Sequence, residues 1–174
     1  MRKIYVDGKG MIKDGDLVVD DLRKNQIKKL ERKLQDVLKS ELKDFSEIKG
    51  LNKSGLYLIF EGTEIIYVGK TEREGKMRLR EMVSDYRSHT FNKKLLKKHL
   101  EKKYEFELKS LKKDSKKELI SQGILNEDEF KKAQRKINNY IKEKLKFKFI
   151  EIEDDDLISI EHFAIAILKP IYND

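Results

Sequence analysis

One stretch, SGLYLIFEGTEIIYVGKT at residues 54–71, constrains the fold of this chain more than any other. Two short apolar runs, at about 55–60 and 65–69, flank a Glu61-Gly62-Thr63 turn. Apolar and aromatic runs separated by a short turn that contains glycine predict a β-hairpin. The hairpin sets Gly55-Leu56-Tyr57 and Tyr67-Val68-Gly69 on adjacent strands. Its two tyrosines are either packed aromatic side chains or one half of an active site.

Hydrophobic periodicity predicts the other elements. Short strands are predicted within residues 3–19, and strands by alternation at 104–111 and 146–153. A helix is predicted from about 21 to 45, where apolar residues recur at helical spacing. Further helices are predicted at about 76–88, at 92–102 with Asn92 as N-cap, at 126–145 behind a basic connector, and at 156–167. Asn126 and Glu129 form a capping box at the start of the helix at 126–145. Pro170 follows the helix at 156–167.

These elements give an α+β fold, with a small three-stranded antiparallel sheet flanked by helices. The domain that holds the hairpin spans 51–174, and an N-terminal arm of short strands and an amphipathic helix precedes it at 1–50. A basic helical segment is inserted in the domain at about 104–146. The chain has 174 residues, of which 38% are hydrophobic and 41% charged, so the core is modest but sufficient for a fold.

The formal net charge of +8 is unevenly distributed. Residues 92–148 hold 19 Lys and Arg against 9 Asp and Glu, whereas residues 149–174 hold 1 against 7. A basic stretch beside an acidic one is typical of a polyanion-binding surface next to a site that needs carboxylates. The alternative is a solvated, lysine-rich helix face.

Composition also excludes several classes of protein. The chain has no cysteine, which excludes a disulfide framework and a thiolate metal site. The sequence shows neither the apolar core of a signal peptide nor a run of membrane-spanning length. We expect a soluble, cytoplasmic protein that does not act at a membrane and needs no small-molecule cofactor.

Two phenols become useful bases only beside positive charge, because an unperturbed tyrosine has a pKa of about 10. The sequence GKMRLREM at 75–82 supplies Arg78 and Arg80, which point to different sides of one helix. Glu161 supplies a carboxylate within an otherwise apolar segment, SIEHFAIAIL. Such a carboxylate is costly to bury unless it is paired or binds a cation. The alternative is an exposed position for Glu161 on the polar stripe of its helix.

Taken in order, these residues resemble the GIY-YIG nuclease superfamily. The two tripeptides are followed by Arg78, by Glu161, and by KPIYN at 169–173, as in that family. The resemblance covers about 54–103 and 147–173. Arg78 comes one residue later than in the commonest spacing, so Arg80 is the alternative catalytic arginine. Met82 stands where many members place a histidine or tyrosine, and His89 is the remaining candidate for that role.

The resemblance implies hydrolysis of phosphodiester bonds by Tyr57, Tyr67, Arg78, Glu161 and Asn173. Glu161 would hold one divalent cation, Mg²⁺ with Mn²⁺ as a substitute. Tyr57 would deprotonate or orient the attacking water and Tyr67 would position it. Arg78 would stabilise the charge that develops on the phosphate, and Asn173 would hold the site together by hydrogen bonds.

The expected partner is DNA, in double-stranded form. Basic residues around the site and on the insertion are predicted to contact its phosphates: Lys70, Arg80, Arg87, His89, Lys93, Lys94, Lys97, Lys131, Lys132, Arg135 and Lys136. The residues predicted to form hydrogen bonds with base edges are a cluster on the inserted helix: Gln134, Arg135, Asn138 and Asn139.

The function that these inferences favour is a stand-alone, metal-dependent DNA endonuclease of the restriction or mobile-element type. Cutting both strands would require two active sites and therefore a homodimer, formed through the helix at 21–45. Two alternatives are a non-catalytic DNA-binding module on a nuclease scaffold and a nuclease directed at RNA. The motifs specify neither a recognition sequence nor a cut pattern.

Overall fold

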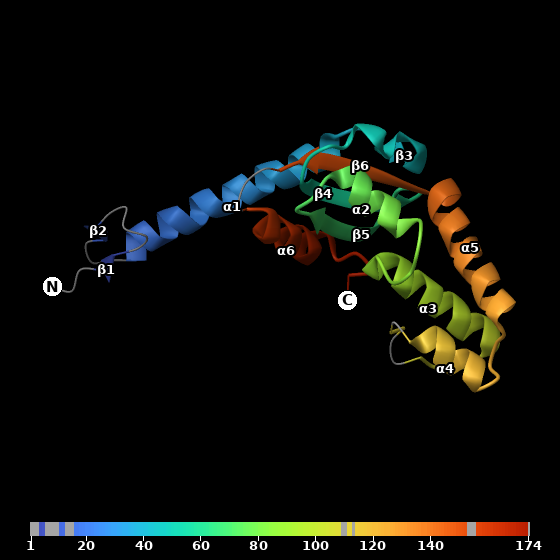
Figure 1. Cartoon of the computed structure of the whole chain (residues 1–174). Helices are drawn as coiled ribbons and strands as arrows, with labels where there is room; N and C mark the ends of the chain where they lie inside the picture. The colour runs from blue at the N-terminus through green and yellow to red at the C-terminus, as the bar shows by residue number, and fades with distance from the viewer. Residues whose placement is uncertain are drawn as a thin grey trace.

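The computed structural model describes residues 4–5, 11–12, 16–108, 111–112, 114–152 and 156–173. Its centre is a four-stranded antiparallel sheet with helices on both faces (Figure 1). This arrangement confirms the predicted α+β class. Within the described ranges, no helix is both long and apolar enough to cross a membrane.

The predicted hairpin forms one half of the sheet. β4 (Gly55–Glu61) pairs with β5 (Glu64–Thr71), and the turn between them contains Gly62 at a φ of +59°, a conformation that glycine adopts without strain. β6 (Leu145–Glu151) pairs with the other side of β4, so that the strand order is β3-β6-β4-β5. β5 is therefore an edge strand.

The fourth strand, β3 (Lys43–Asp44), corrects the prediction of a three-stranded sheet. It pairs with β6 opposite Phe147 and Lys146. The sequence predicts a helix through β3 to Phe45, but α1 (Asp16–Lys39) ends earlier and a 3-10 helix, η1 (Phe45–Gly50), follows the strand. A strand of two residues is too short to leave a periodic signal. The prediction therefore extends the helical periodicity of the preceding residues through it.

The N-terminal arm is dominated by α1, which begins earlier than predicted. β1 (Ile4–Tyr5) and β2 (Met11–Ile12) form a separate antiparallel pair, but residues 16–19, predicted as strand, are helical. Residues 23–29 of α1 are exposed, whereas Leu30, Leu34 and Val37 are buried. The second half of the helix thus packs on the sheet, and the first half extends away from it (Figure 1).

Each face of β4 is covered by its own helices, because successive side chains of a strand point to opposite faces. Leu56 and Leu58 pack with residues of α1 and of α6 (Leu157–Leu168). Tyr57 and Ile59 belong to the opposite cluster, together with residues of α2 (Gly75–Met82), α3 (Thr90–Tyr104) and α5 (Glu127–Lys144). β4 is buried on both faces, and its tyrosine points toward α2 and α3.

The start of α3 differs from the prediction. α2 ends at Met82 rather than near residue 88, and the N-cap of α3 is His89 rather than Asn92. The Nδ1 atom of His89 accepts a hydrogen bond from the Phe91 amide at 3.1 Å. Asn92 is fully buried instead, and its side-chain amide donates to the Met82 carbonyl at 2.7 Å. A loop at 83–89 therefore separates the two helices.

The basic segment between residues 104 and 146 is partly core. The predicted strand at 104–111 does not form in its described part, where Tyr104 ends α3 and residues 105–108 are irregular. A short helix, α4 (Ser115–Ser121), occupies the predicted connector. α5 begins with the predicted Asn126–Glu129 capping box. It contributes Phe130, Ala133, Ile137 and Ile141 to the same cluster as Tyr57.

Candidate active site

The two motif tyrosines lie on one face of the hairpin. Tyr57 on β4 is the register partner of Gly69 on β5, and the rings of Tyr57 and Tyr67 have centroids 6.3 Å apart. A Cβ atom added to Gly69 would lie 2.4 Å from the Tyr57 hydroxyl oxygen. The glycine of the second tripeptide therefore leaves the space that the phenol of the first one occupies.

His89 holds the Tyr57 hydroxyl. Its Nε2 atom lies 2.9 Å from the phenol oxygen, and both side chains are buried. Burial, with a smaller contribution from the charge of Arg78, lowers the pKa of His89 to about 3, so the imidazole is neutral. Because Nδ1 accepts from the Phe91 amide, the single proton resides on Nε2. The imidazole therefore donates to the Tyr57 oxygen.

Arg78 is the second partner of this phenol. Its half-buried guanidinium donates to the Ser88 carbonyl at 3.2 Å and to Glu81 at 3.3 Å, and it lies near enough to the Tyr57 phenol to interact with it electrostatically. Burial and the neighbouring Tyr67 raise the pKa of Tyr57 far above its usual value, and the positive charge of Arg78 opposes that rise. Burial likewise raises the pKa of Tyr67 to about 12. Arg80, the alternative arginine, is exposed.

Glu161 reaches the hairpin from α6, at the edge of β5 that does not pair with β4. Its Oε1 atom accepts a hydrogen bond from the backbone amide of Lys70 at 3.1 Å. The carboxylate is half-buried, and this burial raises the pKa of Glu161, while Lys70 and Arg78 act in the opposite direction. Glu161 is therefore neither an exposed surface residue nor one half of a close ion pair among the described residues.

The donor set around Glu161 fits a hydrated divalent cation. The described part of the chain contains no group of three or more His, Cys, Asp or Glu side chains that could enclose a metal ion. A single half-buried carboxylate suits Mg²⁺, which keeps several waters and is completed by substrate phosphate oxygens. A cation there would also offset the unfavourable burial that raises the pKa of this carboxyl.

Asn173 binds the edge of β5. Its side-chain oxygen accepts from the Val68 amide at 2.8 Å, and its side-chain nitrogen donates to the Val68 carbonyl at 2.7 Å. The Tyr172 amide donates to the Ile66 carbonyl at 3.1 Å. Together with the bond from the Lys70 amide to Glu161, these contacts satisfy four backbone groups on the outer edge of a strand that would otherwise be open to pairing. They fix the strand that carries Tyr67.

The predicted DNA contacts differ in their exposure and in their acidic neighbours. His89 is 1% exposed and bonded to Tyr57, so it cannot contact DNA as predicted. Several of the predicted cations have acidic neighbours, since Lys70 pairs with Glu72 at 2.5 Å and Arg87 with Asp85 at 2.6 Å. Longer pairs of this kind involve Lys97 and Lys131, each at 3.4 Å. The side chains of Arg80, Lys132, Arg135 and Lys136 are exposed, and those of Lys93 and Lys94 are half-buried.

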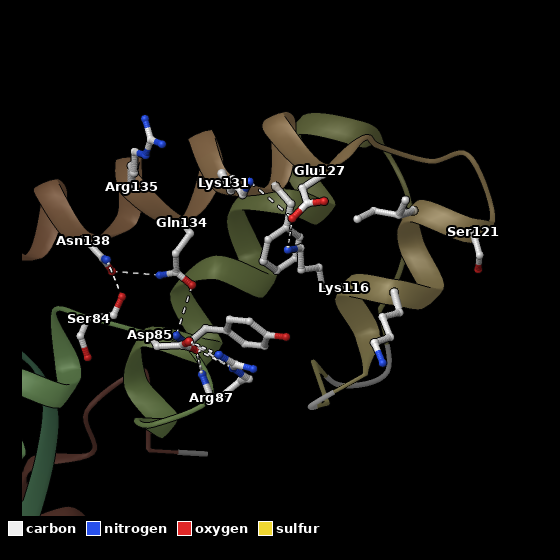
Figure 2. A pocket seen from close by; sticks show the side chains of 14 residues that line it. Ser84, Asp85, Arg87, Lys116, Ser121, Glu127, Lys131, Gln134, Arg135 and Asn138 are labelled. Atoms are coloured by element: carbon white, nitrogen blue, oxygen red, sulfur yellow. Dashed lines mark hydrogen bonds and ion pairs between the residues drawn. The ribbon is translucent and has the colours of Figure 1, made fainter.

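Two members of the predicted base-reading cluster have a structural role instead. The amide nitrogen of Gln134 donates to Asn92 at 3.0 Å and to Asn138 at 2.9 Å, and its oxygen accepts from the Tyr86 amide at 3.2 Å. Asn138 donates to the Ser84 carbonyl at 2.7 Å (Figure 2). These bonds join α5 to the loop that carries His89. The sequence offers no signal for this network, because amides on a basic helix look like surface residues.

A comparison with protein families agrees with this geometry. A family model described as the GIY-YIG catalytic domain matches residues 38–174. The match spans the hairpin, α2, α6 and the C-terminal tail that contains Asn173. Comparison with the curated proteins and with the solved structures gives no match.

Proposed function

The chain belongs to the GIY-YIG catalytic domain family, a family of nucleases, and we propose that it is a divalent-metal-dependent endonuclease that hydrolyses phosphodiester bonds in DNA. The observation that carries this proposal is the convergence of a phenol, a guanidinium and a carboxylate on one hairpin. Tyr57 bonds to His89 and lies near the charge of Arg78, and Glu161 is fixed at the adjacent strand.

Tyr57 is the proposed general base. In the free protein its phenol is protonated, because burial raises its pKa. The hydrogen bond from neutral His89 and the charge of Arg78 both favour the phenolate, which is the form that can accept a proton from water. Because the phenol is protonated at rest, it must first release its own proton to solvent before it can accept one from the attacking water. Tyr67, on the same face, would orient the water or the phosphate.

Arg78 is proposed to bind the scissile phosphate. A fixed guanidinium that donates to phosphate oxygens stabilises the charge that develops in the transition state. In this structure Tyr57 has no exposed surface, and Arg78 is near enough to influence its pKa. A phosphate that draws the half-buried guanidinium toward solvent would therefore also give water access to the phenol. Ser88 and Glu81 keep the arginine near this position in the absence of substrate.

Glu161 is the proposed ligand of the divalent cation, Mg²⁺ or Mn²⁺. When bound, such a cation supplies a Lewis acid for the phosphate oxygens and lowers the cost of their negative charge. The chain's own contribution is to hold the carboxylate in place through the Lys70 amide. We place the enzyme among restriction or mobile-element nucleases, and propose that α1 pairs two copies when both strands are cut.

The experiment that tests this proposal is the incubation of supercoiled plasmid with the full chain, with and without Mg²⁺. Nicked and linear products that require the metal support an endonuclease. Retardation of DNA without any cleavage in Mg²⁺ or Mn²⁺ would indicate a binding module instead.

A further inference from the structure

A groove of about 780 Å³ lies beside the active-site loop, between α4, α5 and residues 84–87 (Figure 2). Its walls come from the insertion and from the loop between α2 and α3, and neither catalytic tyrosine lines it. The volume falls within the range of about 300–1,000 Å³ that is typical of sites for small ligands or a few linked residues. A DNA duplex is too wide to enter a hollow of this size.

The groove is lined by an excess of positive charge. Five cationic side chains border it, Arg87, Lys116, Lys117, Lys131 and Arg135, against two acidic ones, Asp85 and Glu127. Asp85 pairs with Arg87, and Glu127 pairs with Lys116 at 2.9 Å and with Lys131 at 3.4 Å. Lys117 and Arg135 are exposed at the rim. The complementary ligand is therefore an anion with more than one negative charge.

Apolar groups also line this groove. Tyr86, Ile120 and Phe130 border it. The rings of Tyr86 and Phe130 pack edge to face at 5.5 Å and are only 4% and 3% exposed, so the partly exposed Ile120 offers the more accessible apolar surface. The outside of a duplex presents phosphates and sugars, which gain little from an apolar surface. An unpaired strand presents both phosphates and base faces, which is the combination that suits a basic groove with an apolar wall.

The groove adjoins the catalytic arginine. A smaller pocket lined by Asp85, Arg87, Ser88 and Lys93 shares Asp85 and Arg87 with it. The Ser88 carbonyl accepts from Arg78 at 3.2 Å. Basic residues therefore form a continuous series on the surface, from Arg78 through Arg87 to the lysines and arginine of α4 and α5 that line the groove.

We propose that this groove binds an unpaired nucleic-acid strand that continues from the scissile phosphate. The inference rests on the proposed nuclease function and specifies its substrate: a DNA in which a single-stranded segment lies beside the bond that is cut. Gln134 and Asn138 hold the wall formed by residues 84–86, so the groove and the loop bearing His89 have a fixed relation.

The test compares binding of three fluorescent DNAs of equal length by fluorescence polarisation: a single strand, a blunt duplex, and a duplex with a single-stranded arm. The full chain carrying Glu161→Gln is used, so that binding is measured without cleavage. A groove variant adds Lys117→Gln, Lys131→Gln and Arg135→Gln. A matched control adds Lys132→Gln, Lys136→Gln and Lys142→Gln, three exposed positions of α5 that do not line the groove.

We expect the groove variant to lose about tenfold or more in affinity for the single strand and the armed duplex. The slope of log K against log salt should fall by about 0.7 for each single-strand phosphate contact removed. Blunt-duplex binding should change no more than it does in the control. The proposal is overturned if both variants weaken all three DNAs equally, or if the blunt duplex loses as much as the armed one. A wild-type chain that binds armed DNA in the groove but never cuts it contradicts the proposed function alone.

Discussion

The Nε2 atom of His89 lies 2.9 Å from the hydroxyl oxygen of Tyr57, although 31 residues separate the two in the sequence. The loop between α2 and α3 brings the imidazole to the sheet, and the Phe91 amide fixes its tautomer. The contact gives a buried phenol a hydrogen-bond donor, beside the nearby charge of Arg78.

The first prediction concerns the stability of the fold at low pH. His89 has a folded pKa of about 3, whereas an unfolded histidine has about 6.5, so between these values only the unfolded chain takes up the proton. The free energy of unfolding should therefore fall as the pH drops from about 6.5 toward 3, by at most about 1.4 kcal/mol per pH unit from this group. His89→Gln should remove this component. Urea midpoints at pH 7 and pH 5 measure it, and equal losses in both proteins would contradict a buried neutral imidazole.

The second prediction uses the glycine opposite Tyr57. Gly69→Ala should destabilise the protein by about 1–3 kcal/mol and abolish most cleavage, because its Cβ would meet the phenol oxygen at 2.4 Å. Gly50→Ala is the control, since an added Cβ there has no neighbour within 4 Å. Thermal melting and plasmid nicking report the two effects. Wild-type activity in Gly69→Ala would show that the phenol does not need its present position.

The third prediction separates the two arginines of α2. Arg78→Ala should lower the cleavage rate by about a hundredfold or more, the scale for losing one preorganised donor to a developing charge. Arg80→Ala should chiefly weaken DNA binding, because its side chain is exposed on another side of the helix. Single-turnover rates and binding constants distinguish them. Reversed phenotypes would transfer the catalytic role to Arg80.

The fourth prediction concerns the C-terminal tail. Asn173→Ala should cost about 1–3 kcal/mol, because it leaves both backbone groups of Val68 without their partner. Asn173→Asp should recover little of this stability. It keeps an acceptor for the Val68 amide, but it places a carboxylate oxygen instead of the donor NH2 beside the Val68 carbonyl. Chemical unfolding measures both changes. Wild-type stability in Asn173→Ala would mean that water replaces these bonds at no cost.

The sequence predicted the elements whose signals are local. The hairpin at 54–71, the Asn126 capping box and the approximate position of α6 each follow from spacing that spans a few residues. The order of motifs also indicated Tyr57, Arg78 and Glu161 as candidates that the fold brings together. These features need no knowledge of distant contacts.

The features that the sequence did not predict depend on contacts between distant segments. β3 exists because two residues reach β6, and Asn92 is buried because α5 supplies Gln134 and Asn138 to complete its hydrogen bonds. His89 was predicted both as a DNA contact and as the candidate for the role that Met82 leaves open, and only its contact with Tyr57 distinguishes the two. Its burial follows from the position of β4 and α3, which no local pattern encodes.

The most direct test of the account is metal-dependent nicking by Glu161→Gln. The substitution preserves the shape of the side chain and an acceptor for the Lys70 amide, so the fold and DNA retardation should remain as in the wild type. Plasmid nicking in Mg²⁺ should fall below detection, because the cation loses its proposed protein ligand. Cleavage by Glu161→Gln at the wild-type rate, with the same dependence on Mg²⁺, would contradict the assignment of this carboxylate and with it the proposed active site.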